Sequence, residues 1–172
     1  VDAGNRSATT QRVTIGATHD GMLTAIQLEA DVAMGVGGWF AGPGKIYHEM
    51  YACPNVQTTE MFVYTHTGAM ASFRAPGHVE GAFGLESAMD VLARELGMDP
   101  LELRRLNHAD HDQEKRRRYS AKNLDRCYEE GSRRFGWDAA AAPRRTAAAS
   151  QRVPRGRRCS FLCWPPGGGP PA

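Results

Sequence analysis

An arginine in a Pro/Gly turn is the feature of this sequence with the clearest chemical potential. The turn SFRAPG, at residues 72–77, stands directly before the strongest helical periodicity in the chain. Backbone N–H groups, the positive end of a helix and a guanidinium all favour an anionic ligand. The residues therefore predict an anion site at Arg74. A surface arginine engaged in an ordinary ion pair is the alternative interpretation.

Other patterns that could do chemistry are incomplete. The glycine-rich loop at 35–44 has Phe40 where a GxGxxG motif needs its third glycine, and no helix is expected to follow the loop. His108 and His111 lack the spacing of a structural zinc site, so no metal ligands are predicted. The basic run KRRR at 115–118 hints at nucleic-acid binding, but the acids just before it favour a solvated loop.

The pattern along the chain predicts strands first and helices second. Alternating apolar residues predict strands at 10–18, 22–33 and 56–67, with Asp20-Gly21 turning the first strand into the second. Apolar spacings of three and four, with capping residues, predict three helices. They follow Gly77, Asp99 and Ser120, and they end at Gly97, Asn107 and Phe135, with a charged loop at 108–119. This order is typical of an α+β fold.

Composition changes abruptly after Trp137. The chain of 172 residues has a formal net charge of +2, yet residues 138–172 contain six arginines and one acidic residue. That segment is rich in Ala, Pro and Gly and has too few large apolar residues for a core. We therefore predict a domain over 1–137 and a disordered tail over 138–172, and a GC-rich gene translated out of frame would have the same composition. No run of about 18 apolar residues occurs, so no membrane span is expected.

The turn lies within a longer family-like pattern. The chain reads FRAPGHVEGAFGLESAMDVLARELGMDPLELRRLN from Phe73, and YACPNVQTTEMFVYTHTGAMAS stands just before it. These stretches resemble the molybdenum-binding large subunit of the xanthine dehydrogenase and aldehyde oxidase family, nearest to bacterial aldehyde oxidoreductases. The resemblance covers roughly residues 10–137. It implies part of a molybdopterin-binding domain, with Arg74 as a catalytic residue and Phe73, Arg74, Ala75 and Gly77 as cofactor contacts.

The same resemblance implies an activity and partners. The activity is hydroxylation of an aldehyde or aromatic heterocycle with oxygen from water, on a molybdenum–molybdopterin cofactor in its cytosine dinucleotide form. Electrons would leave through an iron–sulfur subunit and a flavin (FAD) subunit, with no membrane partner. Purine-oxidising members carry a substrate-orienting arginine at the position of Gly42, so a purine is disfavoured. The implied compartment is the cytoplasm, and export to the periplasm is the alternative.

The family's general base is a glutamate in a glycine-rich motif that this sequence does not contain. The GGG at 167–169 lies among prolines with no glutamate nearby. Because the hydroxylation needs a base, and because the chain begins at Val1, we expect a fragment that is inactive alone. The alternatives are a non-catalytic protein that binds an anion at Arg74, and a nucleic-acid-binding protein that uses residues 115–118 with the basic tail.

Overall fold

The computed structural model describes residues 6–37 and 41–137 in two units, residues 6–120 and 121–137. The first unit contains β1 (Thr9–Ala17), β2 (Leu23–Gly35), α1 (Lys45–Glu49), β3 (Val56–Tyr64), α2 (His78–Leu96), α3 (Pro100–Leu106), β4 (His111–Asp112) and β5 (Arg117–Arg118). The second unit contains α4 (Leu124–Phe135). The predicted α+β class is confirmed. The tail predicted at 138–172 lies outside the described residues, as does Phe40 in the glycine-rich loop.

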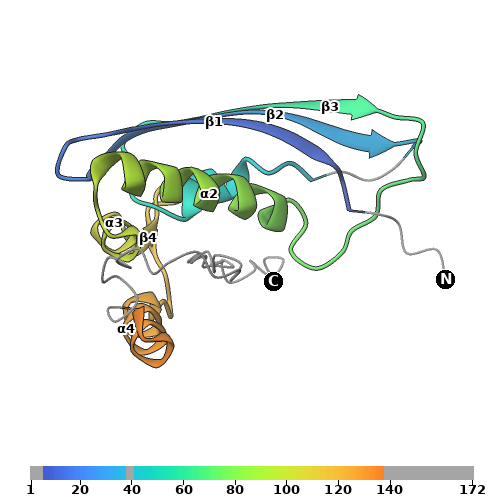
Figure 1. Cartoon of the computed structure of the whole chain (residues 1–172). Helices are drawn as coiled ribbons and strands as arrows, with labels where there is room; N and C mark the ends of the chain where they lie inside the picture. Colours follow the sequence, from blue (N-terminus) through green and yellow to red (C-terminus); the bar gives the residue numbers. More distant parts are fainter. Residues whose placement is uncertain (1–5, 38–40, 138–172) are drawn as a thin grey trace, which may run out of the picture. The chain divides into compact units, whose positions relative to one another are not determined.

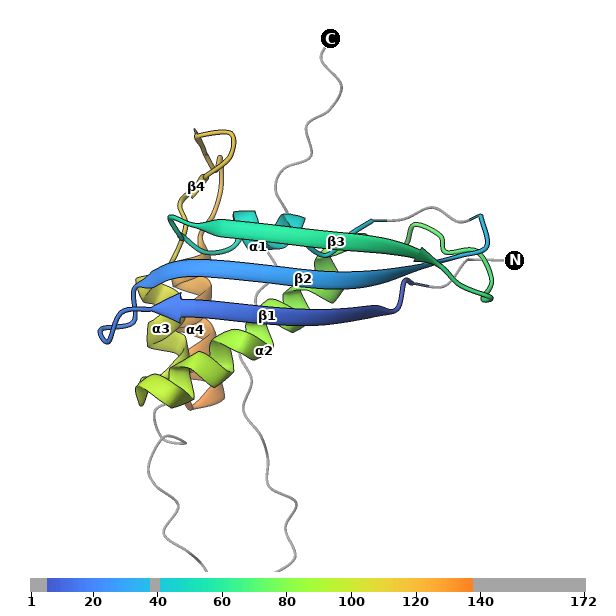
Figure 2. The same cartoon turned by 90° about the horizontal axis from the view of Figure 1, so that it is seen from above.

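The three long strands form one sheet in the order β1-β2-β3 (Figure 2). β1 and β2 are an antiparallel hairpin, as the Asp20-Gly21 turn predicts, and Gly21 has a φ of 90° that suits glycine. β2 and β3 are parallel, with Leu28 opposite Thr58. Parallel neighbours need a long connection, and residues 36–55, which include α1, supply it.

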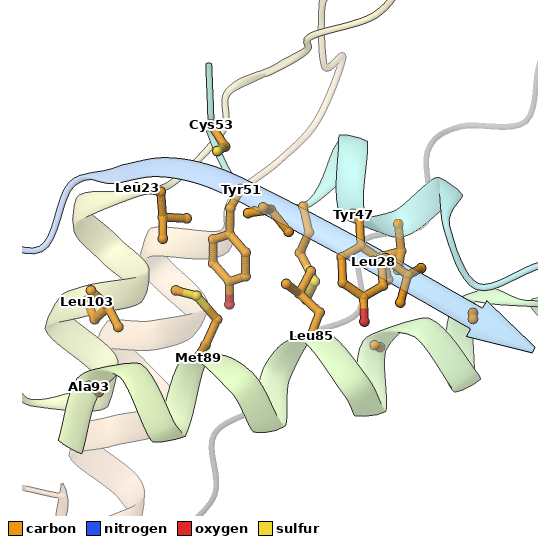
Figure 3. Close-up of a cluster of buried hydrophobic side chains, with 14 residues drawn as sticks. Leu23, Leu28, Tyr47, Tyr51, Cys53, Leu85, Met89, Ala93 and Leu103 are labelled. Atoms are coloured by element: carbon orange, nitrogen blue, oxygen red, sulfur yellow. The ribbon is translucent and has the colours of Figure 1, made fainter. Parts of the chain in front are cut away.

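Helix α2 lies against one face of the sheet (Figure 1). The alternation of β2 places Leu28 on this covered face, where it is fully buried with Leu85 and Met89 of α2. Tyr47 and Tyr51 fill the space between β2 and α2 (Figure 3). Burying each such side chain stabilises the fold by about 1.5–3 kcal/mol. This core fixes where α2 begins, and therefore where the turn at 72–77 lies.

The ends of α2 and α3 match their sequence signals. Gly97 ends α2 in the left-handed conformation, with a φ of 66°. Asp99 caps α3, and its Oδ1 accepts from the N–H of Leu101 at 2.8 Å and of Glu102 at 3.2 Å. Both helix ends are therefore confirmed as predicted.

Asn107, the residue after α3, ties that helix to the β1–β2 hairpin. Its Oδ1 accepts from the N–H of Leu23 at 2.8 Å, and its Nδ2 donates to the carbonyl of Gly21 at 2.8 Å and of Leu103 at 2.9 Å. The side chain is 1% exposed. Its amide therefore satisfies three backbone groups that would otherwise be buried without partners.

Three expectations about local structure were wrong. A helix, α1, does follow the glycine-rich loop, although it has only five residues. The predicted loop at 108–119 contains the small antiparallel hairpin of β4 and β5. The last helix begins at Leu124 rather than directly after Ser120, and its N-cap residue, Asn123, makes no side-chain capping bond. Within residues 6–37 and 41–137, none of the helices has the length and apolar character that crossing a bilayer requires.

Candidate functional site

The turn that carries Arg74 connects the end of the sheet to the first residue of α2. Its backbone is unusual, because Ala75 has a φ of 56° and Gly77 a φ of 75°. A residue with a side chain pays about 1–2 kcal/mol for the left-handed conformation. Such local strain persists only where the surrounding structure holds it, so the contacts around the turn are informative.

Gly77 is held against a second Pro/Gly turn, at residues 41–44. A Cβ atom on Gly77 would lie 2.2 Å from the carbonyl oxygen of Gly42, so only glycine fits. One helical turn later, a Cβ on Gly81 would lie 2.3 Å from the carbonyl oxygen of Pro43. The N–H of Gly44 donates to Oε1 of Glu60 at 2.7 Å, which anchors the second turn to β3. The two turns therefore form one tightly packed unit.

Arg6 holds the other side of the Arg74 turn. Its Nη2 donates to the carbonyl of Arg74 at 3.0 Å, with a longer contact to the carbonyl of Phe73 at 3.5 Å. Its Nη1 donates to Oε1 of Glu80, on the first turn of α2, at 3.2 Å. The guanidinium carbon also lies 5.4 Å from the centre of the Phe73 ring. Neither Arg6 nor Glu80 was identified from sequence.

A histidine and a carboxylate lie close together behind the turn. His78, the first residue of α2, places Nε2 at 3.6 Å from Oε2 of Glu49, and both side chains are less than a tenth exposed. The other oxygen of Glu49 is 3.5 Å from Nζ of Lys45. Nδ1 of His78 lies 3.2 Å from the carbonyl oxygen of Pro76. The pair thus connects α1 to the turn from the buried side.

The predicted site residues lie together and face solvent. Phe73 is 64% exposed and Arg74 is exposed, whereas Ala75 is half-buried and Gly77 is buried. Within the part of the chain that the structure describes, the Arg74 guanidinium has no ion-pair partner. An accessible guanidinium beside backbone N–H groups fits the oxygen-rich, anionic character of a pterin cofactor.

The other candidate residues make local contacts where the structure describes them. Nδ1 of His111 lies 2.6 Å from Oδ1 of Asp110, on an exposed part of the chain. No cluster of three or more His, Cys, Asp or Glu side chains suited to a metal occurs among the described residues. In the basic run, Arg118 pairs with Asp110 at 3.7 Å and Lys115 with Asp112 at 3.3 Å. These acids offset part of the positive charge of the run.

Comparison with known proteins identifies the family of the chain. Residues 1–108 match the family described as the molybdopterin cofactor-binding domain. The chain is 34% identical over 134 residues to the aldehyde oxidoreductase molybdenum-binding subunit PaoC of Escherichia coli O157:H7, covering 77% of this chain and 18% of that subunit. It is 37% identical over 113 residues to the nicotinate dehydrogenase large molybdopterin subunit of Eubacterium barkeri, covering 61% of this chain and 26% of that subunit.

Solved structures show the same fold. The aldehyde oxidoreductase of Desulfovibrio desulfuricans ATCC 27774 superposes with a TM-score of 0.72 at 26% identity, over 84% of this chain and 17% of that one. The aldehyde oxidoreductase of Desulfovibrio gigas gives a TM-score of 0.69 at 25% identity, with the same coverage. The chain thus spans about a fifth of the length of these relatives. It belongs to the molybdopterin cofactor-binding domain family of molybdenum-dependent oxidoreductase large subunits.

Proposed function

We propose that this chain forms one wall of the cofactor site in a molybdenum hydroxylase that oxidises an aldehyde or an aromatic heterocycle. One observation carries the proposal. The guanidinium of Arg74 is exposed, has no ion-pair partner among the described residues, and stands on a strained turn at the start of α2. This arrangement favours the binding of an anionic, oxygen-rich group.

Each residue of the turn has a distinct role in this proposal. Arg74 binds oxygen atoms of the cofactor or substrate through charge-assisted hydrogen bonds, which are stronger than neutral ones. Phe73 and Ala75 contribute main-chain groups, and Gly77 allows the turn to sit against the backbone of Gly42. The bound cofactor would supply the two-electron oxidation that adds an oxygen atom from water to the substrate carbon.

The space around Gly42 supports the proposed substrate class. A Cβ atom there would lie 2.0 Å from Oε1 of Glu60, a carboxylate that is itself bonded to Gly44. An arginine at this position would have to displace Glu60. The geometry therefore supports a substrate other than a purine. Two relatives named for aldehyde oxidation and nicotinate dehydrogenation support an aldehyde or an aromatic heterocycle.

The remaining features of the enzyme are also proposals. The cofactor would be the cytosine dinucleotide form, and electrons would pass to iron–sulfur and flavin (FAD) subunits. Two relatives are named as subunits of larger enzymes, which supports partners of some kind. We place the assembled enzyme in the cytoplasm, with the periplasm as the alternative.

We further propose that the chain alone is inactive and retains little cofactor, because it contains no glycine-rich motif with a glutamate base. The test is to measure molybdenum and pterin per chain after purification from cells that make the cofactor. Molybdenum well below one atom per chain is expected. A value near one would contradict the proposal of an incomplete site.

The role of Arg74 is tested in a chimera in which residues 6–137 replace the matching segment of the E. coli subunit. We expect Arg74→Ala to lower aldehyde oxidation about 100-fold or more, the usual effect of losing a donor to a developing charge. Arg94→Ala is the matched control, because this arginine of α2 is exposed and pairs only with Glu95 at 3.7 Å among the described residues. Equal activity of the Arg74→Ala and unsubstituted chimeras would contradict the assignment.

A further inference from the structure

The contacts of Arg6 carry an inference about how the Arg74 turn is prepared for its ligand. Arg6 is 68 positions away from Arg74 in sequence, and its Nη2 donates to the Arg74 carbonyl at 3.0 Å. The same nitrogen lies 3.5 Å from the Phe73 carbonyl oxygen. Arg6 therefore contacts two consecutive peptide groups, both through their oxygen atoms.

The planar trans peptide bond determines where the N–H groups of Arg74 and Ala75 point when Arg6 binds the carbonyls. The described chain contains no cis peptide bond, and in a trans peptide the C=O and the following N–H point in opposite directions. When Arg6 holds the carbonyls of Phe73 and Arg74, the N–H groups of Arg74 and Ala75 point away from Arg6. Among the described residues, neither N–H donates to a protein acceptor.

The backbone at Ala75 makes the same point independently. Ala75 has a φ of 56°, whereas Arg74 is not among the residues with positive φ. Successive backbone N–H groups converge on an anion where a residue in the right-handed region precedes one in the left-handed region, and Ala75 supplies the left-handed residue. The carbonyl contacts of Arg6 hold these peptides in place.

Arg6 is itself fixed by several contacts. Its Nη1 donates to Glu80 Oε1 at 3.2 Å, and Glu80 is only 10% exposed. The backbone carbonyl of Glu80 accepts from Nε2 of Gln11, on β1, at 2.9 Å. Two residues after Arg6, the carbonyl of Ala8 accepts from the N–H of Ala33, on β2, at 2.9 Å. Arg6 is thus positioned by both the sheet and α2.

We propose that Arg6 is a positioning residue that turns the N–H groups of Arg74 and Ala75 toward an oxyanion. Glu80 holds Arg6 in the required place and neutralises its charge. The orientation of the N–H groups rests on the contacts of Arg6 with the carbonyls of Phe73 and Arg74. The identity of the oxyanion as part of a molybdenum cofactor rests on the proposed function. Molybdate, a tetrahedral oxyanion, is the probe for the ligand.

The test uses the full chain labelled with ¹⁵N. We expect Arg6→Ala to shift and broaden the amide signals of Arg74 and Ala75, and to leave those of the core residues Leu28 and Leu85 unchanged. Arg12→Ala is the matched control, because Arg12 lies on β1, is 82% exposed and is 3.8 Å from Glu29. In a molybdate titration, Arg6→Ala should weaken binding at the Arg74 and Ala75 amides about tenfold or more, as loss of an orienting residue does.

Two further variants keep the test decisive if Arg6→Ala does not fold. Arg6→Lys keeps the charge but has one nitrogen, which cannot hold Glu80 and the two carbonyls together. Glu80→Gln removes the anchor of Arg6 and leaves its guanidinium intact. Both should move the amide signals of Arg74 and Ala75 in the same direction as Arg6→Ala, by smaller amounts.

The outcomes separate this inference from the proposed function. Unchanged Arg74 and Ala75 amide signals in the folded Arg6 variants would overturn the positioning role, whatever molybdate does. If the unsubstituted chain does not respond to molybdate but its turn amides depend on Arg6, the positioning role stands and the proposed function loses its ligand. An equal loss of signal dispersion across the core would instead show that Arg6 is only a structural tie.

Discussion

Arg104 of α3 donates from Nε to Oε2 of Glu86 on α2 at 2.7 Å, and both side chains are buried. The other carboxylate oxygen accepts from the hydroxyl of Tyr51 at 2.6 Å. Arg104 also donates to Oδ1 of Asp90 at 2.8 Å and to the carbonyl of Pro100 at 3.0 Å. Both carboxylate oxygens of Glu86 and the guanidinium of Arg104 are therefore hydrogen-bonded, and the ion pair connects α2 to α3.

Removing one partner of this pair should destabilise the fold severely. Arg104→Met leaves Glu86 buried without its cation, which typically costs about 3–5 kcal/mol. Urea unfolding of the full chain measures the loss, and the exposed Arg94→Ala should stay within about 0.5 kcal/mol of the unsubstituted chain. A loss below about 1 kcal/mol for Arg104→Met would show that the pair contributes little.

The same variant should acquire a pH dependence of known sign. Burial is the main cause that raises the pKa of Glu86 above its usual range, and the positive charge of Arg104 acts against it by lowering that pKa. The loss of Arg104 therefore raises the pKa of Glu86 further. A group with a raised folded-state pKa favours folding at low pH and loses that contribution as pH rises through its folded pKa. Arg104→Met should therefore be less destabilised at pH about 5 than at pH about 8, as followed by urea midpoints.

Two glycine substitutions separate backbone strain from steric contact. Gly77 and Gly97 have similar φ values of 75° and 66°, but only Gly77 would bring a Cβ atom close to a neighbouring carbonyl, that of Gly42. Gly97→Ala should cost about 1–2 kcal/mol from the left-handed conformation alone. Gly77→Ala should cost clearly more, measured as a lower thermal midpoint. Equal costs would mean that the turns at 41–44 and 72–77 are not in close contact.

The two cysteines in the described residues should differ in reactivity. Burial raises the pKa of the Cys53 thiol, whose Sγ donates to the carbonyl of Asn55 at 3.4 Å, whereas Cys127 is exposed. Because the thiolate is the reactive form, iodoacetamide should modify Cys127 much faster than Cys53. Peptide mapping by mass spectrometry follows each site over time. Comparable rates would place Cys53 in contact with solvent.

The β4–β5 hairpin should lose stability in acid. The hydrogen bond from the backbone N–H of Lys115 to Oδ1 of Asp112, at 3.0 Å, is the main cause that lowers the pKa of Asp112. A lowered folded-state pKa contributes stability above the unfolded value, near about 3.9, and this is lost as pH falls through the folded pKa. Amide exchange at 111–118 should therefore accelerate below about pH 4. Asp112→Asn should weaken that dependence, and Asp31→Asn, on β2, should leave it intact.

Local signals in the sequence were enough for much of the fold. The end of α2 at Gly97 and the cap of α3 at Asp99 depend on residues within one turn of each other. The local sequence is therefore enough to predict both helix ends. The Arg74 turn was identifiable for the same reason. Asp90 illustrates the limit, since its spacing of four residues from Arg94 is typical of an exposed ion pair on a helix. Asp90 instead accepts from Arg104, because the packing of α3 on α2 brings a buried guanidinium closer.

Non-local relationships could not be predicted in this way. Alternation marks β3 as a strand but does not reveal that it is parallel to β2. Nothing near Arg6 in the sequence indicates that it contacts the carbonyl of Arg74. The short helix α1 was missed because five residues show too little periodicity, and it exists because Tyr47 and Ile46 are buried against the core.

Asn107 has a consequence for the order in which the chain acquires structure. A β-hairpin such as β1–β2 closes in about 1–10 μs, whereas the bond from Leu23 to Asn107 joins residues 84 positions apart. The entropic cost of closing a loop increases with that separation. The hairpin should therefore form before α3 packs against it. In pulse-labelled hydrogen exchange during refolding, the Gly21 amide, bonded to Thr18 within the turn, should gain protection before the Leu23 amide. During synthesis on the ribosome, the hairpin would lack its hydrogen bonds to Asn107 until that residue has emerged.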